Sequence, residues 1–358
     1  MSLAPRAVLV HRTTEYEELL ARHGTHGQAA YFLGSRGRDI AEVAERHHRT
    51  LRALAEVAAA VPASWRQARV ERADLDRFLF GPEDVVVVVG QDGLVANAAK
   101  YLDGQPVVGI DTDPGRNPGV LVRHRAADAR KLLPAAASGR SAREALTMVA
   151  AVADDTQRLL ALNEIYLGPP GHQTARYRLG RVRKVPPAPR RLARTLAAPG
   201  EGPSTSSTRA CARHAESTHQ TPQGPPSGRT TGLYGHDLAP DAEGEPAEPQ
   251  ASSGVLVGTG TGATGWLRSL WLQRGGGLAL PTPTERQLAW FVREAWPSPA
   301  TGTARVEGLL GSGEALRLTV ESERLVAFGD GMEGDALDLT WGQTVRIGVA
   351  DTALHLAG

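Results

Sequence analysis

The chain of 358 residues has few of the features that indicate a secreted, membrane or nucleic-acid-binding protein. It contains one cysteine, Cys211, so no disulfide can form within the chain and a cysteine-based metal site is not expected. No apolar run approaches the roughly 20 residues of a membrane span, and the first residues lack the apolar stretch of a signal peptide. A formal net charge of +1 argues against general binding to nucleic acid or to a membrane surface. We therefore expect a cytoplasmic protein without nucleic-acid or membrane partners.

The composition allows a globular protein, because 41% of the residues are hydrophobic and the length favours two domains. In the first part, strands alternate with helices, and this pattern predicts a Rossmann-like α/β domain with a parallel, three-layer sheet over residues 1–153. Within it, apolar residues at helical spacing predict one long helix from Ile40 to Ala58. Ser141 and Glu144 form a plausible capping box, so we expect a second helix from there to about Ala153.

Residues 154–358 have a different pattern, in which short apolar stretches are separated by glycine turns. They predict a mostly antiparallel β domain, with a helix at Trp266–Gln273. The stretch at about 186–250 is rich in Pro, Gly, Ser and Thr and has almost no large apolar residues. Such a segment buries too little apolar surface to offset its ordering entropy, so we predict a disordered insertion there.

The first stretch that indicates a binding or catalytic site is Val85–Val89, followed by Gly90-Gln91-Asp92-Gly93. Consecutive valines predict a strand buried on both faces, as in parallel sheets. The turn after it precedes a helix, whose free N–H groups and partial positive charge suit a phosphate group. Asp92 is then either a carboxylate that binds metal or accepts a proton, or the acid that caps the helix. Its place beyond the carboxyl end of a parallel strand, where ligands bind, favours the functional alternative.

This stretch resembles the Gly-Gly-Asp-Gly motif of NAD kinases, a superfamily that includes diacylglycerol and sphingosine kinases. Further on, Gly109-Ile110-Asp111-Thr112-Asp113-Pro114 is similar to a Gly-x-Asn-Thr-Asp-Pro stretch of the mitochondrial type of NAD kinase. Two more motifs of this family follow in the same order along the chain.

The third motif, Leu162-Asn163-Glu164-Ile165, resembles the Asn-Glu pair that binds the ribose of the nucleotide to be phosphorylated in NAD kinases. The fourth, Gly258–Trp266, is similar to their Thr-Pro-Thr-Gly-Ser-Thr-Ala-Tyr motif, and closer to the mitochondrial type, which has Ser-Ser-Gly before it, here Ser252–Gly254. By residue type alone, a glycine–threonine loop is either a flexible turn or a cradle of backbone N–H and hydroxyl groups.

The resemblance implies an ATP-dependent kinase that phosphorylates a ribose hydroxyl of NAD to give NADP, uses Mg²⁺ and forms a homo-oligomer. It implies that Asp92 is the catalytic acid that orients or deprotonates the acceptor hydroxyl, although no metal-binding motif stands out in the sequence. Phosphate and ATP binding would fall to Gly90, Gln91 and Gly93. The acceptor would be bound by Asn163, Glu164, Thr261, Thr264, Gly265, Trp266 and Ser269, with Trp266 stacked on a base. Asp111 and Asp330 are further candidates, the latter in an Asp-Gly turn that resembles one near the family's active site and is otherwise a good hairpin turn.

Four positions depart from the family pattern. Gln91 replaces a glycine of the family motif, at a position where glycine would allow a positive φ, and Leu94 replaces a residue with a hydroxyl group. Asp111 stands where the family has Asn, and Ser253 stands where the bacterial enzymes have Asp. Two alternatives therefore stay open. One is a kinase of the same fold that acts on another polyol, such as a nucleoside, sugar or lipid. The other is a non-catalytic nucleotide-binding protein.

Overall fold

The computed structural model describes residues 4–116, 119–154, 157–183 and 246–358. Most of the insertion predicted at about 186–250 lies outside the described residues, which resume at Pro246. Among the helices of the described ranges, none combines the length and the apolar character needed to cross a membrane.

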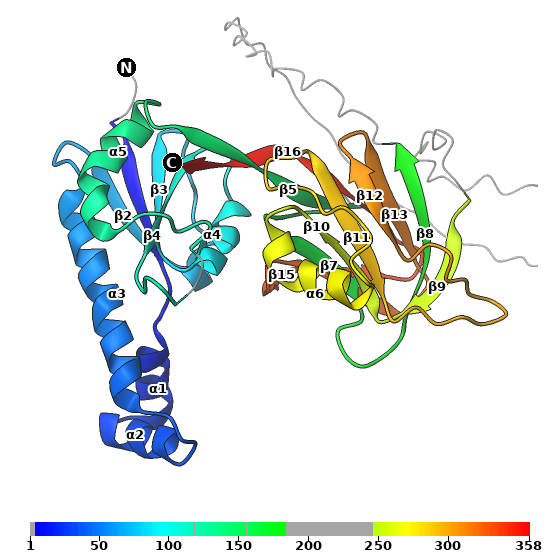
Figure 1. Ribbon diagram of the computed structural model, residues 1–358, viewed down its shortest axis with the longest axis horizontal. Helices are drawn as coiled ribbons and strands as arrows, with labels where there is room; N and C mark the ends of the chain where they lie inside the picture. The colour runs from blue at the N-terminus through cyan, green and yellow to red at the C-terminus, as the bar shows by residue number, and fades with distance from the viewer. Residues whose placement is uncertain (1–3, 117–118, 155–156, 184–245) are drawn as a thin grey trace, which may run out of the picture. The chain divides into compact units, whose positions relative to one another are not determined.

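The first half is built on a parallel sheet (Figure 1). Its strands, in the order β2-β1-β3-β4, are β1 (Arg6–His11), β2 (Arg66–Glu71), β3 (Asp84–Gly90) and β4 (Pro106–Asp111). The five valines of β3 are at most 1% exposed, as the unbroken apolar run predicts.

Helices cover both faces of this sheet. On the sheet lie α3 (Ile40–Ala60), α4 (Asp92–Ala99) and α5 (Ala129–Ala137), whereas α1 (Glu15–His23) and α2 (His26–Gly34) pack against the end of α3 that extends beyond the sheet (Figure 1). Successive side chains of a strand point to opposite faces, so Val86 and Val88 pack in one cluster with Val95 of α4. Val85, Val87 and Val89 pack in another cluster with residues of α3 and α5. The predicted three-layer α/β arrangement is confirmed.

Local signals explain where the first helices begin. Thr14 accepts the backbone N–H of Glu17 and forms a capping box with it at the start of α1. Asp39 caps α3, and the helix ends just before Pro62 as predicted. Two of the helices, α2 and α5, are not indicated by the sequence pattern.

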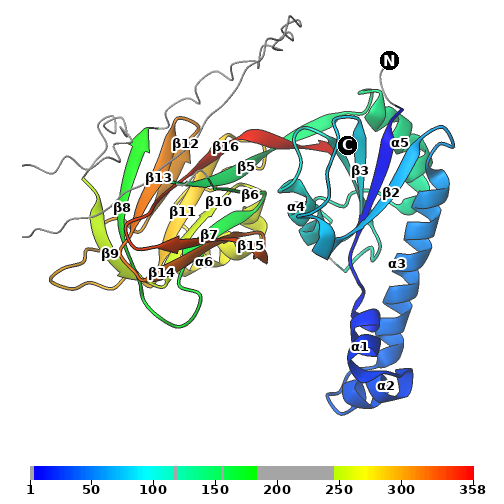
Figure 2. The same cartoon turned by 180° about the vertical axis from the view of Figure 1, so that it is seen from behind.

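The second half contains two antiparallel regions (Figure 2). One is a six-stranded sheet that consists of β7 (Glu164–Gly168), β10 (Gly254–Gly258), β11 (Gln287–Arg293), β12 (Glu307–Gly311), β14 (Arg324–Gly329) and β15 (Met332–Thr340). The order of its strands is β12-β11-β10-β7-β14-β15. The other strands extend the parallel sheet to ten strands: β5 (Arg143–Ala153), β6 (Arg158–Ala161), β8 (Ala175–Arg183), β9 (Glu248–Ser252), β13 (Glu314–Val320) and β16 (Thr344–Ala357). The helix α6 (Trp266–Gln273) has the bounds that the sequence predicts.

The helix predicted from the capping box at Ser141 is wrong. Residues 143–153 form β5, which pairs antiparallel with β16 from Arg143 opposite Ala357 to Ala153 opposite Val345. Along β5, Val149, Ala151 and Ala153 alternate into the core of the second half. Backbone pairing on two sides, with β16 and β6, outweighs a local capping pattern and the helix preference of alanine.

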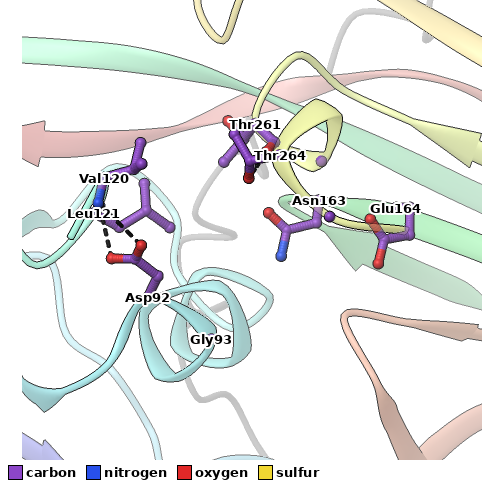
Figure 3. Close-up of a pocket in the computed structure, with 10 residues that line it drawn as sticks. Asp92, Gly93, Val120, Leu121, Asn163, Glu164, Thr261 and Thr264 are labelled. Atoms are coloured by element: carbon purple, nitrogen blue, oxygen red, sulfur yellow. Dashed lines mark hydrogen bonds between the residues drawn. The ribbon is translucent and has the colours of Figure 1, made fainter. Parts of the chain in front are cut away.

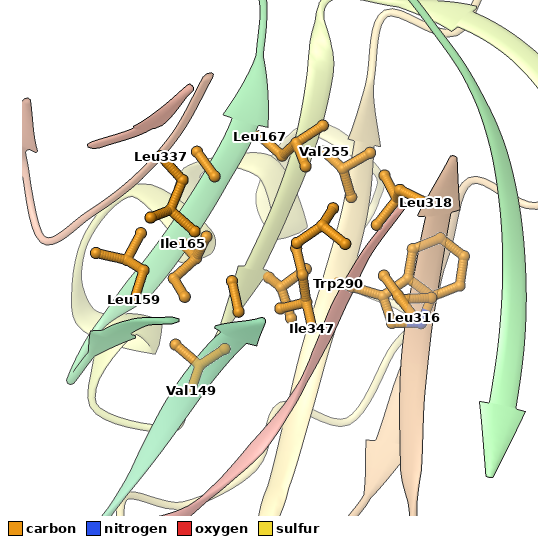
Figure 4. Packing of buried hydrophobic residues seen from close by; sticks show 14 of the residues in the cluster. Val149, Leu159, Ile165, Leu167, Val255, Trp290, Leu316, Leu318, Leu337 and Ile347 are labelled. Atoms are coloured by element: carbon orange, nitrogen blue, oxygen red, sulfur yellow. The ribbon is translucent and has the colours of Figure 1, made fainter. Parts of the chain in front are cut away.

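The core of the second half lies between the two sheets (Figure 4). Ile165 and Val255 from one sheet pack against Leu318 and Ile347 from the other, and Trp290 is 3% exposed among them. The predicted fold class, an α/β domain followed by a mostly antiparallel β domain, is confirmed. The long strands β5 and β16 take part in both halves, since the end of β16 pairs parallel with β4.

Candidate functional site

Asp92 lies at the carboxyl end of β3, as the first residue of α4. Its carboxylate does not cap the helix. Instead, Oδ1 accepts the backbone N–H groups of Leu121 (2.8 Å) and Val122 (2.9 Å), and Oδ2 accepts that of Val120 (3.0 Å). The residue at the N-cap is Gln91, which makes no side-chain capping bond. The capping interpretation of Asp92 is therefore wrong, and the carboxylate is fixed to a segment about 30 residues further along the chain.

The backbone at Gln91 is ordinary. Its φ of −121° and ψ of 166° are extended angles that any residue adopts. The substitution of the family's glycine by Gln91 thus introduces no backbone strain here. Gly90 ends β3, where an added Cβ would lie 3.1 Å from Cδ2 of Leu94, and the side chain of Gln91 is exposed.

The loop that donates its backbone N–H groups to Asp92 packs closely on β4. An added Cβ at Gly109 would lie 2.1 Å from the carbonyl oxygen of Leu121, so only glycine fits there. Asp111 accepts the backbone N–H of Asp113 through Oδ1 at 2.8 Å. Asp113 pairs with Arg49 of α3 at 3.1 Å. The side chains of Asp111 and Asp113 therefore stabilise the turn after β4 in which they stand.

Asn163 stands in a tight turn between β6 and β7, and Glu164 begins β7. The turn is held by the carboxylate of Asp330, which accepts the backbone N–H groups of Leu162 (2.7 Å), Asn163 (2.8 Å) and Glu164 (3.3 Å). Asp330 adopts a φ of 53° between β14 and β15. Burial raises the pKa of Asp330 to about 6, although the N–H groups of Leu162 and Asn163 oppose that shift.

The carboxyl group of Glu164, which is labelled in Figure 3, is half-buried and accepts no hydrogen bond from the described residues. Burial, together with the nearby charge of Asp330, raises the pKa of Glu164 to about 8. The carboxyl group is therefore mostly protonated at pH 7 and can donate as well as accept a hydrogen bond. A buried acid without a partner is a group that a polar ligand can satisfy.

The glycine–threonine loop after β10 is bonded to the same turn. Thr259 donates its hydroxyl to the carbonyl of Leu162 at 2.6 Å and its backbone N–H to that of Asn163 at 2.8 Å. An added Cβ at Gly262 would lie 2.4 Å from the carbonyl oxygen of Asn163, so a side chain is excluded. The Oγ1 atom of Thr261 is buried and has no hydrogen-bond partner in the part of the chain that the structure describes. The loop therefore has a fixed conformation and an unsatisfied hydroxyl group.

Four segments, at residues 92–93, 120–121, 163–164 and 261–265, surround one pocket with about 410 Å³ of empty space that is partly open to solvent (Figure 3). The cavity volume itself is about 100 Å³, which is smaller than the roughly 300–1,000 Å³ that is usual for small-molecule sites. The pocket is lined by Asp92, Gly93, Val120, Leu121, Asn163, Glu164, Thr261, Gly262, Thr264 and Gly265.

The structure thus brings seven of the predicted site residues to one pocket: Asp92, Gly93, Asn163, Glu164, Thr261, Thr264 and Gly265. The other predicted residues lie outside its lining: Gly90, Gln91, Trp266, Ser269, Asp111 and Asp330. Trp266 stacks on Tyr166, with ring centroids 5.4 Å apart, and Arg293 lies 5.5 Å from its ring centroid. Ser269 is exposed on α6, one turn beyond Gly265.

Sequence reasoning missed three of the lining residues, Val120, Leu121 and Gly262. Gly262 stands inside the motif, and the absence of a side chain could have indicated a close approach. Val120 and Leu121 carry no such signal, since they take part through backbone N–H groups. Among the described residues, no group of three or more His, Cys, Asp and Glu is arranged to hold a metal ion.

The fold defines the chain as an α/β and β protein with a pocket at the carboxyl end of its parallel strands. No family profile matches the sequence, and no curated protein sequence matches it either. Among solved structures, the chain is similar to a crystal structure of yeast NADH kinase complexed with NADH, with a TM-score of 0.50 and 11% identity. The likeness covers 99% of this chain and 84% of that one. The chain therefore has an NAD kinase-like fold.

Proposed function

We propose that this protein is a kinase of the NAD kinase type, which transfers the terminal phosphoryl group of ATP to a ribose hydroxyl of NAD or NADH. The observation that carries the proposal is the meeting of three distant motifs, at Asp92, Asn163 and Thr261, around one pocket on this fold. The name of the yeast neighbour supports NAD(H) as the acceptor class. The resemblance to the mitochondrial type rests on the motifs alone.

The acceptor is bound by the turn at Asn163 and by the loop at Thr261. The side-chain amide of Asn163 and the carboxyl of Glu164 together offer donors and acceptors to two neighbouring hydroxyl groups of a ribose. The unpaired Oγ1 of Thr261 gains a partner when a polar ligand binds. Trp266 adjoins Gly265 of the lining and contributes an aromatic face toward the base, with Ser269 on the same helix.

The phosphate donor is bound at the start of α4. Free N–H groups at this helix end and the side-chain-free Gly93, where an added Cβ meets nothing within 4 Å, suit the close approach of phosphate oxygens. Gly90 and Gln91 complete the turn. Mg²⁺ usually binds through one or two carboxylates together with the substrate's phosphates, so a site with a single ionised acid fits it. The ion would neutralise charge on the phosphates in transfer.

Asp92 orients the acceptor hydroxyl. A carboxylate has about four lone-pair positions, and three backbone N–H groups occupy three of them. One position of Oδ2 is left for the hydroxyl proton or the metal ion. The three bonds fix the carboxylate, and such fixed geometry is what phosphoryl transfer requires most.

A non-catalytic nucleotide-binding protein is the second candidate. The observation that favours it is the engagement of Asp92 with three backbone N–H groups, which also suits a purely structural carboxylate. Under this alternative the pocket still binds NAD but transfers no phosphate.

One experiment separates these functions. Purified protein is incubated with Mg-ATP and, in parallel, with NAD, NADH, a nucleoside panel and a sugar panel, and phosphorylated products are quantified by chromatography. Binding of each acceptor is measured by calorimetry. Formation of NADP or NADPH supports the proposal. Product from another polyol alone identifies a same-fold kinase, whereas binding without any product supports the non-catalytic alternative. The same preparation gives the oligomeric state, for which we propose a homo-oligomer.

A further inference from the structure

The far end of α4 carries polar side chains that contact the β14–β15 region. Asn97 is 5% exposed, donates its amide to the carbonyl of Asp330 at 2.8 Å, and accepts Nε of Arg72 at 2.6 Å. Lys100, just after the helix, donates to the carbonyl of Gly329 at 3.2 Å and to the carboxylate of Asp335 at 2.7 Å. The C-terminal end of α4 is thus bonded to the β14–β15 turn through two side-chain contacts and to β15 through a third.

The contact between Lys100 and Asp335 is buried. The side chain of Lys100 is 1% exposed and that of Asp335 is 18% exposed, and Tyr101 donates its hydroxyl to the same carboxylate at 2.8 Å. Buried ion pairs are on average no more stabilising than apolar residues of similar volume, because both charges lose their hydration. Stability alone therefore does not account for a buried lysine at this place.

The turn that Lys100 and Asn97 contact is the turn that holds the acceptor segment. Asp330 accepts three backbone N–H groups from residues 162–164, and its own backbone N–H donates to the carbonyl of Glu164 at 3.2 Å. Gly329 packs directly on β6, since an added Cβ there would lie 2.7 Å from Cβ of Ala161. The turn has no freedom to shift without moving the acceptor segment.

At its other end, the same helix begins with Asp92. The rise of an α-helix is 1.5 Å per residue, so Asp92 and Lys100 are separated by about 12 Å of one rigid element. A continuous path of bonded groups therefore runs from the carboxylate of Asp92, along α4, through Asn97 and Lys100 to Asp330, and on to Asn163 and Glu164.

We propose that Lys100 and Asn97, with Asp335, are positioning residues that set the distance between Asp92 and the acceptor held at Asn163–Glu164. The inference rests on the proposed kinase function and deepens it. None of these three residues lines the pocket, so they act through the elements they join. Displacement of reacting groups by about 1 Å can lower turnover on the order of 10²-fold.

The test compares Lys100→Met with the wild type in the full chain. We expect kcat with Mg-ATP and NAD to fall roughly 10²-fold, while the dissociation constant of NAD changes less than about threefold, because Lys100 does not line the pocket. The double variant Lys100→Met/Asp335→Leu removes the unpaired charge and should recover the melting temperature but not kcat. Recovery of both would show that the bridge only stabilises the fold.

A matched control exists at the opposite end of β3. Arg6 pairs with Asp84, whose side chain is fully buried, at 2.6 Å, and this pair lies away from the pocket. Arg6→Met should lower the melting temperature in the same way as Lys100→Met and leave kcat unchanged. An equal loss of kcat in both variants would overturn the inference.

A readout without catalysis separates this inference from the proposed function. Hydrogen exchange, followed by mass spectrometry on peptides that cover 119–123 and 161–165, reports the amides bonded to Asp92 and to Asp330. In Lys100→Met both peptides should exchange faster, whereas in Arg6→Met neither should change. If wild-type protein phosphorylates no acceptor, the kinase proposal fails, yet this comparison still decides whether the bridge couples the two segments. Unchanged exchange in Lys100→Met would refute the coupling.

Discussion

The substitution Asp92→Asn tests both roles of this side chain, since the carboxylate is a hydrogen-bond acceptor within the fold and the proposed group that orients the acceptor hydroxyl. An asparagine can place its one oxygen where Oδ1 accepts two backbone N–H groups, but its NH₂ group would then face the N–H of Val120. One backbone donor loses its partner, which destabilises the fold by about 1–3 kcal/mol. The two remaining bonds lose their charge assistance, for about 1 kcal/mol each.

Together these losses amount to about 3–5 kcal/mol, and because Asp92 is only half-buried we take the lower part, about 3–4 kcal/mol for the variant. At about 2–4 °C per kcal/mol, the melting temperature should fall by roughly 6–16 °C. Turnover should fall at least 10²- to 10⁴-fold, roughly the contribution of general acid–base assistance, while NAD still binds. Calorimetric melting and a product assay at a temperature well below both transitions measure the two effects separately.

The control is Glu248→Gln. Glu248 accepts the backbone N–H groups of Ala304 (2.9 Å) and Arg305 (3.0 Å), and it does not line the pocket. Its substitution removes one comparable bond and should lower the melting temperature without changing turnover. If Asp92→Asn keeps turnover within about threefold of wild type, or if Glu248→Gln loses as much, the catalytic assignment of Asp92 is refuted. An unchanged melting temperature in Asp92→Asn would contradict the hydrogen-bond argument.

Three further predictions concern the acceptor side of the pocket. Gly262→Ala places a Cβ 2.4 Å from a carbonyl oxygen of the β6–β7 turn and should lower the melting temperature and abolish NAD binding in calorimetry. Gly265→Ala, with no atom nearer than 3.9 Å, should keep the wild-type melting temperature, and equal melting temperatures of the two variants would show that the loop readjusts. Because burial raises the pKa of Glu164 to about 8, above its ordinary value of 4.5, the stability linked to this group is greatest below pH 4.5 and is lost as pH rises toward 8, by about 1.4 kcal/mol per pH unit. Between pH 5 and 8 the melting temperature of the wild type should therefore fall relative to that of Glu164→Gln. If the two melting temperatures change with pH in parallel, the burial of this acid is contradicted. Stacking of a base on an aromatic ring contributes about 1–3 kcal/mol, so Trp266→Ala should weaken NAD binding roughly tenfold or more. The control Trp296→Ala changes an exposed tryptophan and should leave NAD binding as it is. Unchanged affinity in Trp266→Ala would mean that Trp266 only packs on its aromatic neighbour.

Much of the fold follows from local patterns in the sequence. The run Val85–Val89 has no polar residue to place toward solvent, so it indicates a strand covered on both faces, as the structure has it. The apolar spacing of α3 and the threonine cap of α1 depend only on neighbouring residues, and the bounds of α6 were predicted for the same reason. Where a structure depends on contacts within one turn or one strand, the sequence alone determines it.

Tertiary structure decided the rest. Residues 143–153 have a helix-like start, but pairing with β16, about 200 residues further on, makes them a strand. Asp92 had a neighbouring helix to cap, yet its carboxylate binds N–H groups 28–30 residues away. Asp330 reaches back 166–168 residues to hold the turn at Asn163, and Lys100 bonds to Asp335 across 235 residues. A carboxylate or ammonium group is satisfied by whichever partner the folded chain brings to it, and no local pattern specifies that partner.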